Sequence, residues 1–371
     1  MVEALAPQLS GIGRYSWELA RRLPQNPAIE TLRYRLPGRW VEDPAYLVEG
    51  RLLARRPWFR RMAPRPIRTW LNRRELRGSL VHGPNYFLPV EAETGIVTIH
   101  DLSVFTFPKA HPAVRVAQFE RQFRKSLDKA AHFITDTATI RDELIAFAGI
   151  SADMVSVVPL GVSEAYHPRS VESLNSLFRR YGLEGGYGLC VSALEPRKRI
   201  DRLIQAWSSL PRALRDHRPL VLAGVKGWLN DDLHQRIERG RVEGWLHFLD
   251  FVSEADLPEL YAGAGLFVYP SIYEGFGLPP IEAMASGVPV IVSNRSCLPE
   301  TCGDAALYID PDDHAGFLET LVCGLTDEAW RKAAIDRGLV RASRYGWQRC
   351  ADETALVYQK LWRDLNSASV R

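Results

Sequence analysis

Short runs of apolar, mostly β-branched residues alternate along the chain with stretches whose apolar positions recur about every 3.6 residues. Four runs in the first half are expected strands: Leu80–His82, Ile96–Ile99, His132–Thr135 and Val155–Val158. Six more are expected in the second half: Leu189–Val191, Leu220–Ala223, His247–Leu249, Leu266–Tyr269, Val290–Val292 and Leu307–Ile309. Apolar runs without polar alternation are typical of parallel strands that helices cover on both faces. The pattern therefore predicts an α/β chain of doubly wound sheets.

A length of 371 residues is more than one hydrophobic core usually organises, so we expect two domains. The Pro- and Gly-containing segment Val158–Pro168 is the expected hinge between them. The predicted boundaries are residues 1–160 and 161–346, followed by a long amphipathic helix within 347–371. Ligands of doubly wound sheets bind at the carboxyl ends of the strands, so side chains that follow strands are the first functional candidates.

The beginning of the chain departs from this pattern. Residues Ser10–Arg14 predict a loop that leads into a helix with Tyr15, Leu19 and Leu23 on one face. Such a loop normally follows a buried strand, yet only nine residues precede Ser10. We therefore expect the first strand to be shortened, with a native start upstream of Met1.

Composition narrows the class of protein. Apolar residues make up 46% and charged residues 25%, which are values of globular proteins. The 47 basic residues nearly balance the 44 acidic ones, which argues against a dedicated nucleic-acid binder. No apolar run reaches the length of a membrane span. Five cysteines without CxxC spacing indicate a reduced, cytoplasmic chain without structural zinc.

One region, Arg51–Arg77, is strongly basic, with ten arginines and the single acid Glu75. Apolar residues are interleaved with them: Trp58, Phe59, Met62, Ile67 and Trp70. This region is either an ordinary solvated helical face or a surface for anionic lipid headgroups or a lipid diphosphate, where each basic residue contributes ~1 kcal/mol. No recognisable nucleic-acid module accompanies it. The second alternative predicts a peripheral protein at the inner face of a membrane.

The stretch Tyr269–Gly287 carries the most chemical information, because it follows an apolar strand and opens a helix. Glycines in Gly275–Gly277 allow backbone N–H groups to approach a ligand closely. Two prolines follow at positions that suit a first helical turn, whose positive end attracts phosphate. Glu274 and Glu282 lie on either side of this loop, so the two carboxylates could bind hydroxyls at both ends of a diphosphate. Alternatively, Glu282 only caps its own helix.

Glu274 and Glu282 resemble the E-x7-E pattern of the family-4 retaining glycosyltransferases, or glycosyl transferases group 1. The surrounding SIYEGFGLPPIEAMASGVPVIVS at 271–293 is similar to that family almost throughout. The likeness continues through GIGRY at 11–15, HGPNYFLP at 82–89, HDLS at 100–103, VPLGV at 158–162, SALEPRKRIDRLIQAW at 192–207, LAGVKGW at 222–228 and FLDFVSEADLPELYAGA at 248–264. It implies the GT-B fold: an acceptor-binding and a nucleotide-sugar-binding Rossmann-like domain around an interdomain cleft, with a last helix that crosses back to the first domain.

The resemblance also implies roles for individual residues in the second half. Glu274 would hold hydroxyls of the donor sugar, and Glu282 would accept from the ribose hydroxyls. The backbone of residues 275–278 would line the diphosphate and the sugar, through Gly275, Phe276, Gly277 and Leu278. Lys198 would neutralise the diphosphate as it leaves, since cleavage of a glycosyl–phosphate bond builds charge on the leaving oxygen. Val252, Ser253 and Leu257 fall where members of the family hold the nucleobase.

One departure leaves a second cation open. Many members of the family carry an arginine where this chain has Ser192 and Ala193, and Asn or Gly at the position of Arg199. Either Arg197 or Arg199 would then supply the second positive charge. A solvated helix start is the ordinary alternative for Arg197 and Lys198.

The resemblance places three residues of the first half near the donor or acceptor. His100 directly follows the strand Ile96–Ile99 and would contact the donor sugar near the reacting carbon. Alternatively, His100 caps the next turn beside Asp101. Gly11 and Gly13 match a loop near the donor phosphates or the acceptor.

No metal or cofactor is expected besides the nucleotide-sugar substrate. Asp310 and Asp312 have the D-x-D spacing that binds Mn or Mg in other glycosyltransferases, but the proline between them favours a turn after the last strand. Lys198 and the helix terminus would take the place of the cation.

The resemblance thus predicts a retaining hexosyltransferase that uses a nucleoside diphosphate sugar. GIGRY and HDLS resemble bacterial mannosyltransferases of surface-polysaccharide and lipopolysaccharide synthesis, which indicates GDP-mannose as donor and a glycan or lipid-linked acceptor. Two alternatives stay open: a GT-B-fold sugar-nucleotide epimerase or hydrolase, and a non-catalytic scaffold.

Overall fold

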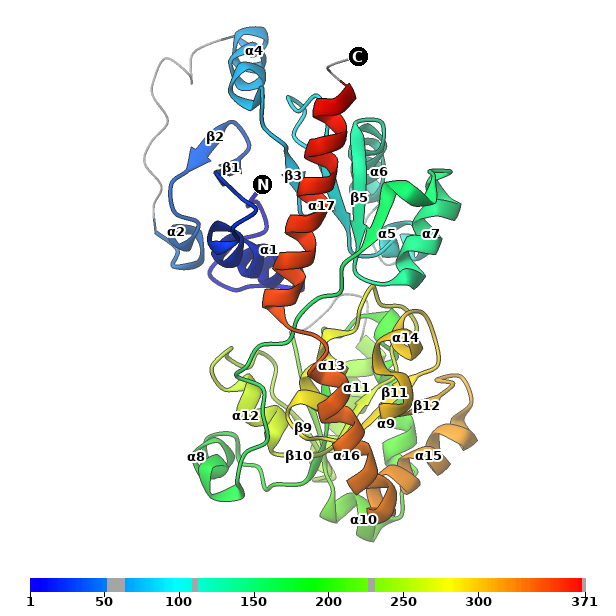
Figure 1. Ribbon diagram of the computed structural model, residues 1–371. Helices are drawn as coiled ribbons and strands as arrows, with labels where there is room; N and C mark the ends of the chain where they lie inside the picture. The colour runs from blue at the N-terminus through cyan, green and yellow to red at the C-terminus, as the bar shows by residue number, and fades with distance from the viewer. Residues whose placement is uncertain (52–63, 109–112, 226–230, 369–371) are drawn as a thin grey trace. The chain divides into compact units, whose positions relative to one another are not determined.

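The computed structural model describes residues 1–51, 64–108, 113–225 and 231–368. It divides into two compact units: unit 1 is Met1–Gly161 with Trp347–Arg371, and unit 2 is Val162–Gly346. The last helix, α17 (Trp347–Ala368), belongs to unit 1 and packs against α1 (Gly11–Arg22). Its Asp352 accepts a 2.7 Å hydrogen bond from Asn26. The predicted return of the C-terminal helix to the first half of the chain is therefore confirmed (Figure 1).

Unit 1 contains a parallel sheet in the order β3-β4-β5-β6. The strands are β3 (His82–Gly83), β4 (Gly95–Ile99), β5 (Ala130–Thr135) and β6 (Val155–Val157). The other helices are α2 (Ala45–Val48), α4 (Arg65–Leu76), α5 (Ser103–Thr106), α6 (Ala113–Leu127) and α7 (Ala138–Ala148), with 3-10 turns η1 (Leu23–Gln25) and η3 (Ala152–Met154). All four predicted strands are confirmed, although β3 has only two residues. Every residue of β4 is buried, as its uninterrupted apolar run predicts.

A hairpin that the hydrophobic pattern did not predict precedes this sheet. Strand β1 (Tyr34–Leu36) pairs antiparallel with β2 (Arg39–Val41) across the turn Pro37–Gly38. Gly38 adopts a φ of 69°, which the missing side chain makes accessible. The strands are short and carry arginines, so they lack the apolar run that marks the other strands.

Unit 2 contains a parallel sheet in the order β12-β11-β10-β7-β8-β9. Its strands are β7 (Tyr187–Val191), β8 (Leu220–Ala223), β9 (Leu246–Phe248), β10 (Ala264–Tyr269), β11 (Val290–Ser293) and β12 (Ala306–Ile309). Its helices are α8 (Val171–Tyr181), α9 (Ile200–Ser208), α10 (Arg212–His217), α11 (Asp231–Val242), α12 (Leu257–Ala262), α13 (Leu278–Ala285), α14 (Leu298–Cys302), α15 (His314–Thr326) and α16 (Glu328–Ala342), with turns η4 (Pro196–Lys198) and η5 (Gly303–Ala305). All six predicted strands are confirmed, and each bound lies within two residues of the predicted one.

The strand order of unit 2 reverses between β7 and β10. The chain builds β7, β8 and β9 toward one edge, then returns to place β10 beside β7 and continues to the other edge. A doubly wound sheet binds its ligands at such a switch point, outside the carboxyl ends of the two strands. The segments that leave these two ends, residues 192–199 and 270–278, are therefore the place to examine for chemistry.

Candidate active site

A buried ion pair joins the two segments at the switch point of unit 2. Lys198 lies in η4 after β7, and Glu274 lies in the loop after β10. The Lys198 ammonium forms a short ion pair with Glu274 and donates a 2.8 Å hydrogen bond to the Tyr269 hydroxyl. The two charged residues are only 7% and 8% exposed. Burial of both charges is tolerated because each charge is paired and hydrogen-bonded.

Arg197 adds a second positive charge to this pair. Its Nη1 lies 3.5 Å from a Glu274 oxygen and donates to the Tyr273 carbonyl at 2.8 Å, while its Nε donates to Glu195 at 3.0 Å. Arg199, the other candidate for the second cation, instead forms an ion pair with Asp312 after β12. The structure thus places Arg197, and not Arg199, beside Glu274.

The charges around Glu274 fix its protonation state. Burial would raise the pKa of Glu274, but the charges of Lys198 and Arg197 outweigh burial and lower this pKa to about 2. Burial lowers the pKa of Lys198 against the opposing effect of Glu274. At neutral pH the Glu274 carboxylate is therefore ionised and faces two cations, while Glu195 balances the charge of Arg197.

The glycine loop after Glu274 is shaped by close packing. Gly277 has a φ of 85°, and a Cβ at this position would lie 2.7 Å from the Leu298 side chain, so only glycine fits. The Glu274 carbonyl accepts hydrogen bonds from the Ser296 hydroxyl at 2.8 Å and the Cys297 thiol at 3.1 Å. The loop is thus tied to the segment after β11. Phe276 is 4% exposed, and its ring packs edge-on against Tyr345 with 5.2 Å between the ring centres.

The remaining donor-binding candidates of unit 2 lie on α12 and α13 and in the loop after β9. Glu282 is half-buried on α13. Burial raises the pKa of Tyr261, and the charge of Glu282 raises it further. Val252 is 9% exposed, and Leu257 begins α12. Ser253 accepts a 3.1 Å hydrogen bond from the Asp256 amide at the start of this helix.

Unit 1 holds a second buried pair, between His100 after β4 and Asp136 after β5. His100 Nδ1 lies 2.8 Å from Asp136 Oδ2, and its Nε2 lies 3.0 Å from the Pro84 carbonyl oxygen. Burial would lower the pKa of His100, but Asp136, the Pro84 carbonyl and Asp101 together raise it. Because both partners are acceptors, this geometry favours the doubly protonated imidazole. Sequence reasoning missed Asp136, although it directly follows an apolar strand as His100 does.

The ring of His100 also contacts α1, the helix that carries the two glycine candidates of unit 1. Tyr15 packs edge-on against His100 at 4.9 Å, and its hydroxyl is hydrogen-bonded to Thr98 at 3.0 Å. Gly13 approaches the chain so closely that a Cβ would lie 2.8 Å from the Ala4 carbonyl oxygen. Gly11 starts α1 in open space, so packing there does not require glycine.

Comparisons with known proteins identify the family of the chain. The family model for glycosyl transferases group 1 matches residues 184–338, and the model for glycosyltransferase family 4 matches residues 9–166. The chain is 39% identical to the O-antigen chain mannosyltransferase B of Escherichia coli, over 97% of this chain and 98% of the relative. The chain belongs to the family-4 glycosyltransferases.

One further relative matches part of this glycosyltransferase, and one solved structure matches nearly all of it. The O-antigen chain mannosyltransferase RfbU of Salmonella typhimurium is 30% identical over 58% of this chain and 57% of its own. The crystal structure of WaaG, a glycosyltransferase involved in lipopolysaccharide biosynthesis, superposes with a TM-score of 0.67 at 16% identity, over 94% of this chain and 96% of WaaG. The predicted GT-B fold class is confirmed by this likeness.

The D-x-D candidate of the glycosyltransferase lies among arginines. Asp310 pairs with Arg295 at 2.8 Å, and Asp312 pairs with Arg199. Across the described ranges, no three His, Cys, Asp or Glu side chains gather as metal ligands. The same ranges contain no helix that is long and apolar enough to cross a membrane.

Proposed function

We propose that this glycosyltransferase transfers mannose from GDP-mannose to a glycan or lipid-linked acceptor during synthesis of an O-antigen-type surface polysaccharide, with retention at the anomeric carbon. The observation that carries the proposal is the buried Lys198–Glu274 pair at the switch point, flanked by Arg197 and the glycine loop. The 39% identity to an O-antigen chain mannosyltransferase supports mannose as the sugar.

In the proposed reaction the donor diphosphate lies against the backbone of residues 275–278 and the start of α13. Lys198 moves from Glu274 toward the leaving phosphate oxygen, where negative charge develops as the glycosyl bond breaks. A buried cation beside the leaving oxygen stabilises this charge strongly, because little water screens it. Glu274, released from Lys198, accepts hydrogen bonds from hydroxyls of the sugar, and Glu282 accepts from the ribose.

Retention follows in this proposal from attack on the same face that the diphosphate leaves. In this proposal Glu274 accepts hydrogen bonds from the sugar hydroxyls and does not attack the anomeric carbon. The leaving phosphate oxygen therefore takes the proton of the attacking acceptor hydroxyl.

A thermal-shift screen tests the donor. GDP-mannose, UDP-glucose, ADP-glucose and dTDP-glucose are added in parallel to the full chain, because only a ligand that binds the native state raises the melting temperature. We expect the largest rise with GDP-mannose, and an α-anomeric product by NMR when a mannose-terminated glycan is supplied. Isomerised or free sugar from donor alone would support an epimerase or hydrolase, and no shift with any donor would support a scaffold.

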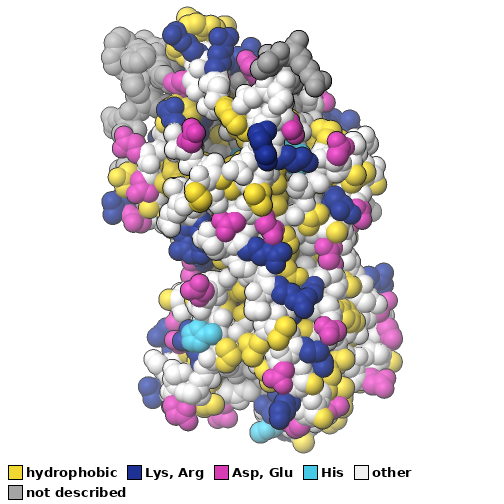
Figure 2. Space-filling view, viewed as in Figure 1, with side chains coloured by type: hydrophobic (Ala, Val, Ile, Leu, Met, Phe, Trp, Pro, Cys, Tyr) yellow, Lys and Arg dark blue, Asp and Glu magenta, His cyan; other side chains and the backbone are white. Residues whose placement is uncertain are grey.

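We propose, in addition, that α4 rests on an anionic membrane surface at the inner face of the cytoplasmic membrane. Ile67 and Trp70 on this helix are 50% and 56% exposed, and Arg73, Arg74 and Arg77 are exposed beside them. Figure 2 shows this mixture of apolar and basic side chains over α4. The rest of the basic region, residues 52–63, lies outside the described residues. Exposed aromatic and basic side chains on one helix are typical of interfacial binding.

Vesicle sedimentation tests this surface. The variant R73Q/R74Q/R77Q should bind vesicles of 30% phosphatidylglycerol several-fold more weakly than the parent and keep its transfer rate on a soluble acceptor. R212Q/R236Q/R241Q, on unit 2, is the matched control for the loss of three charges. Equal binding of both variants would assign α4 to an ordinary solvated face.

A further inference from the structure

One residue beside the candidate site adopts a backbone conformation that glycine would adopt more easily. Ser296, half-buried in the loop after β11, has a φ of 53°, in the left-handed region. A residue with a Cβ is strained in this region, whereas glycine is not. Strained residues gather at functional sites, and what serine has and glycine lacks is the side-chain hydroxyl.

The Ser296 hydroxyl contacts both backbone groups of one residue, the candidate acid Glu274. It donates a 2.8 Å hydrogen bond to the Glu274 carbonyl and lies 3.4 Å from the Glu274 amide, from which it accepts. A hydroxyl can donate and accept at the same time, so the two contacts are compatible. The fully buried thiol of Cys297 donates to the same carbonyl at 3.1 Å. Glu274 is thus held by its backbone as well as by its carboxylate.

The register of the sheet brings these two residues together. β10 and β11 are neighbouring parallel strands, so the segments that leave their carboxyl ends run side by side. Ser293, the last residue of β11, donates to the Ser271 carbonyl at 2.6 Å. Three residues further along each segment, Ser296 meets Glu274. Side-chain hydroxyls therefore continue the pairing of the two strands into their loops.

We propose that Ser296 is a positioning residue of the transfer reaction, which fixes the Glu274 backbone so that the carboxylate stays in place when Lys198 turns to the leaving phosphate oxygen. This inference rests on the proposed function, in which Glu274 then accepts hydrogen bonds from hydroxyls of the sugar. Before that step Lys198 holds the carboxylate directly. After it, Arg197 at 3.5 Å and the backbone contacts of Ser296 still hold Glu274, because neither depends on Lys198.

Loop stability and carboxylate position are then opposed at residue 296. Glycine there would relieve the strain of the φ of 53°, but the Glu274 carbonyl would lose a donor and the carboxylate could shift. A group displaced by about 1 Å from its working position can cost about 10²-fold in rate. Serine at this position therefore lowers the stability of the loop while it fixes the carboxylate, and substitutions can separate the two effects.

Two variants of the full chain separate the hydroxyl from the strain. S296G removes both, so we expect an unchanged or higher melting temperature together with a kcat about tenfold lower than that of the parent. S296T keeps the hydroxyl but adds a β-branch, which is strongly disfavoured at positive φ. We therefore expect S296T to melt at a lower temperature than the parent and to keep a kcat near that of the parent.

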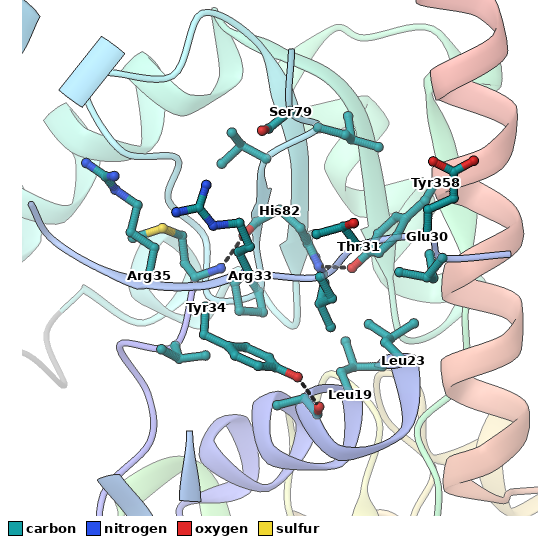
Figure 3. A pocket seen from close by; sticks show the side chains of 18 of the residues that line it. Leu19, Leu23, Glu30, Thr31, Arg33, Tyr34, Arg35, Ser79, His82 and Tyr358 are labelled. Atoms are coloured by element: carbon teal, nitrogen blue, oxygen red, sulfur yellow. Dashed lines mark hydrogen bonds between the residues drawn. The ribbon is translucent and has the colours of Figure 1, made fainter. Parts of the chain in front are cut away.

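The matched control is Y34F in unit 1. The Tyr34 hydroxyl likewise donates to a backbone carbonyl, that of Ala20, at 2.6 Å, beside a cavity of this unit (Figure 3). Loss of this hydroxyl should lower the melting temperature and leave kcat and the donor KM unchanged. A purely structural role of Ser296 would give S296G the same signature as Y34F.

Calorimetry shows whether Ser296 acts through Glu274. GDP carries no sugar, so S296G and the parent should bind GDP equally, whereas S296G should bind GDP-mannose about fivefold more weakly than the parent does. In an E274A background, S296G should have no further effect on the affinity for GDP-mannose, because two residues that act through one contact are not additive.

The proposal is overturned if S296G keeps the parent kcat and GDP-mannose affinity, or if its kcat falls only together with its melting temperature. A kcat of S296T as low as that of S296G, or full additivity of S296G with E274A, would also overturn it. Failure of the proposed function looks different, since the parent itself would then transfer no sugar. A parent that uses another sugar nucleotide would contradict GDP-mannose alone, and the same variants compared on that donor would decide the role of Ser296.

Discussion

Two buried acid–base pairs, one in each unit, are built alike but differ in charge. In each, a cation that follows one strand meets a carboxylate that follows the neighbouring strand: His100 with Asp136 in unit 1, and Lys198 with Glu274 in unit 2. In unit 2 two cations lower the pKa of the carboxylate to about 2. In unit 1 burial outweighs the single histidine and raises the pKa of Asp136.

The number of cations beside the buried carboxylate therefore decides whether its pKa is lowered or raised. Where two cations face one acid, the acid stays ionised although it is buried. Where one histidine faces one acid, burial prevails and raises the pKa of the acid. In unit 2 the acid therefore keeps one cation, Arg197, if Lys198 turns to a ligand.

The largest expected effect comes from removal of the Lys198 ammonium. K198A should lower kcat by about 10²–10³-fold, as the loss of one transition-state stabiliser does in other enzymes, with a smaller change in KM. Steady-state transfer from GDP-mannose measures it. K332A, at an exposed lysine of α16, is the control, and thermal unfolding verifies that both variants are folded. A kcat equal to that of the parent would remove Lys198 from the chemistry.

The second prediction concerns the acid of the same pair. Since the pKa of Glu274 falls from its usual value of 4.5 to about 2 on folding, ionised Glu274 stabilises the protein by roughly 3 kcal/mol at neutral pH. This contribution is complete above about pH 4.5 and is lost as the pH falls toward 2. Denaturant unfolding at pH 7 should thus find E274Q less stable than the parent, and the difference should shrink between pH 4.5 and 3.

The control for this experiment is E319Q, an exposed glutamate on α15, which should follow the parent at every pH. A difference between E274Q and the parent that stays constant down to pH 3 would contradict the ion-paired state of Glu274.

Lys198 and Glu274 also show how much of the molecule the sequence could predict. The ten strands of the two main sheets follow from apolar runs, because buried parallel strands leave little room for polar residues. Glu274 and Lys198 follow from their positions after strands and from the family pattern. The hairpin β1–β2 could not be predicted in this way, because its strands are short and half-exposed. Its Pro–Gly turn was the available signal.

Partners within the site were harder to predict than the site itself. Asp136 and Tyr269 lie far in sequence from His100 and Lys198, and only the sheet order brings each pair together. Which of Arg197 and Arg199 lies beside Glu274 depended on the backbone conformation, which the sequence did not reveal. Arg199 adopts a φ of 53°, and its side chain pairs with Asp312 instead of Glu274.

A smaller effect is expected at the other end of the proposed donor site. E282Q removes a charge-assisted hydrogen bond to the ribose, which should raise the KM for the donor about tenfold and leave kcat nearly unchanged. Donor titrations at saturating acceptor measure both values. E328Q, at the exposed start of α16, controls for the loss of one charge. A fall in kcat without a change in KM would place Glu282 in the chemical step.

The smallest effect, and the sharpest test of the comparison, is expected from D136N. The Asp136 carboxylate raises the pKa of His100 against the effect of burial, so without this charge the His100 pKa should fall. NMR titration of the His100 Cε1 proton, assigned with H100Q, measures the change. In the parent, protonated His100 adds stability at low pH that is lost as the pH rises through its raised pKa. The stability advantage of the parent over D136N should accordingly decline between pH 6 and 8, whereas D128N, at an exposed site after α6, should match the parent. An unchanged His100 titration in D136N would mean that the two units hold their cations by different means.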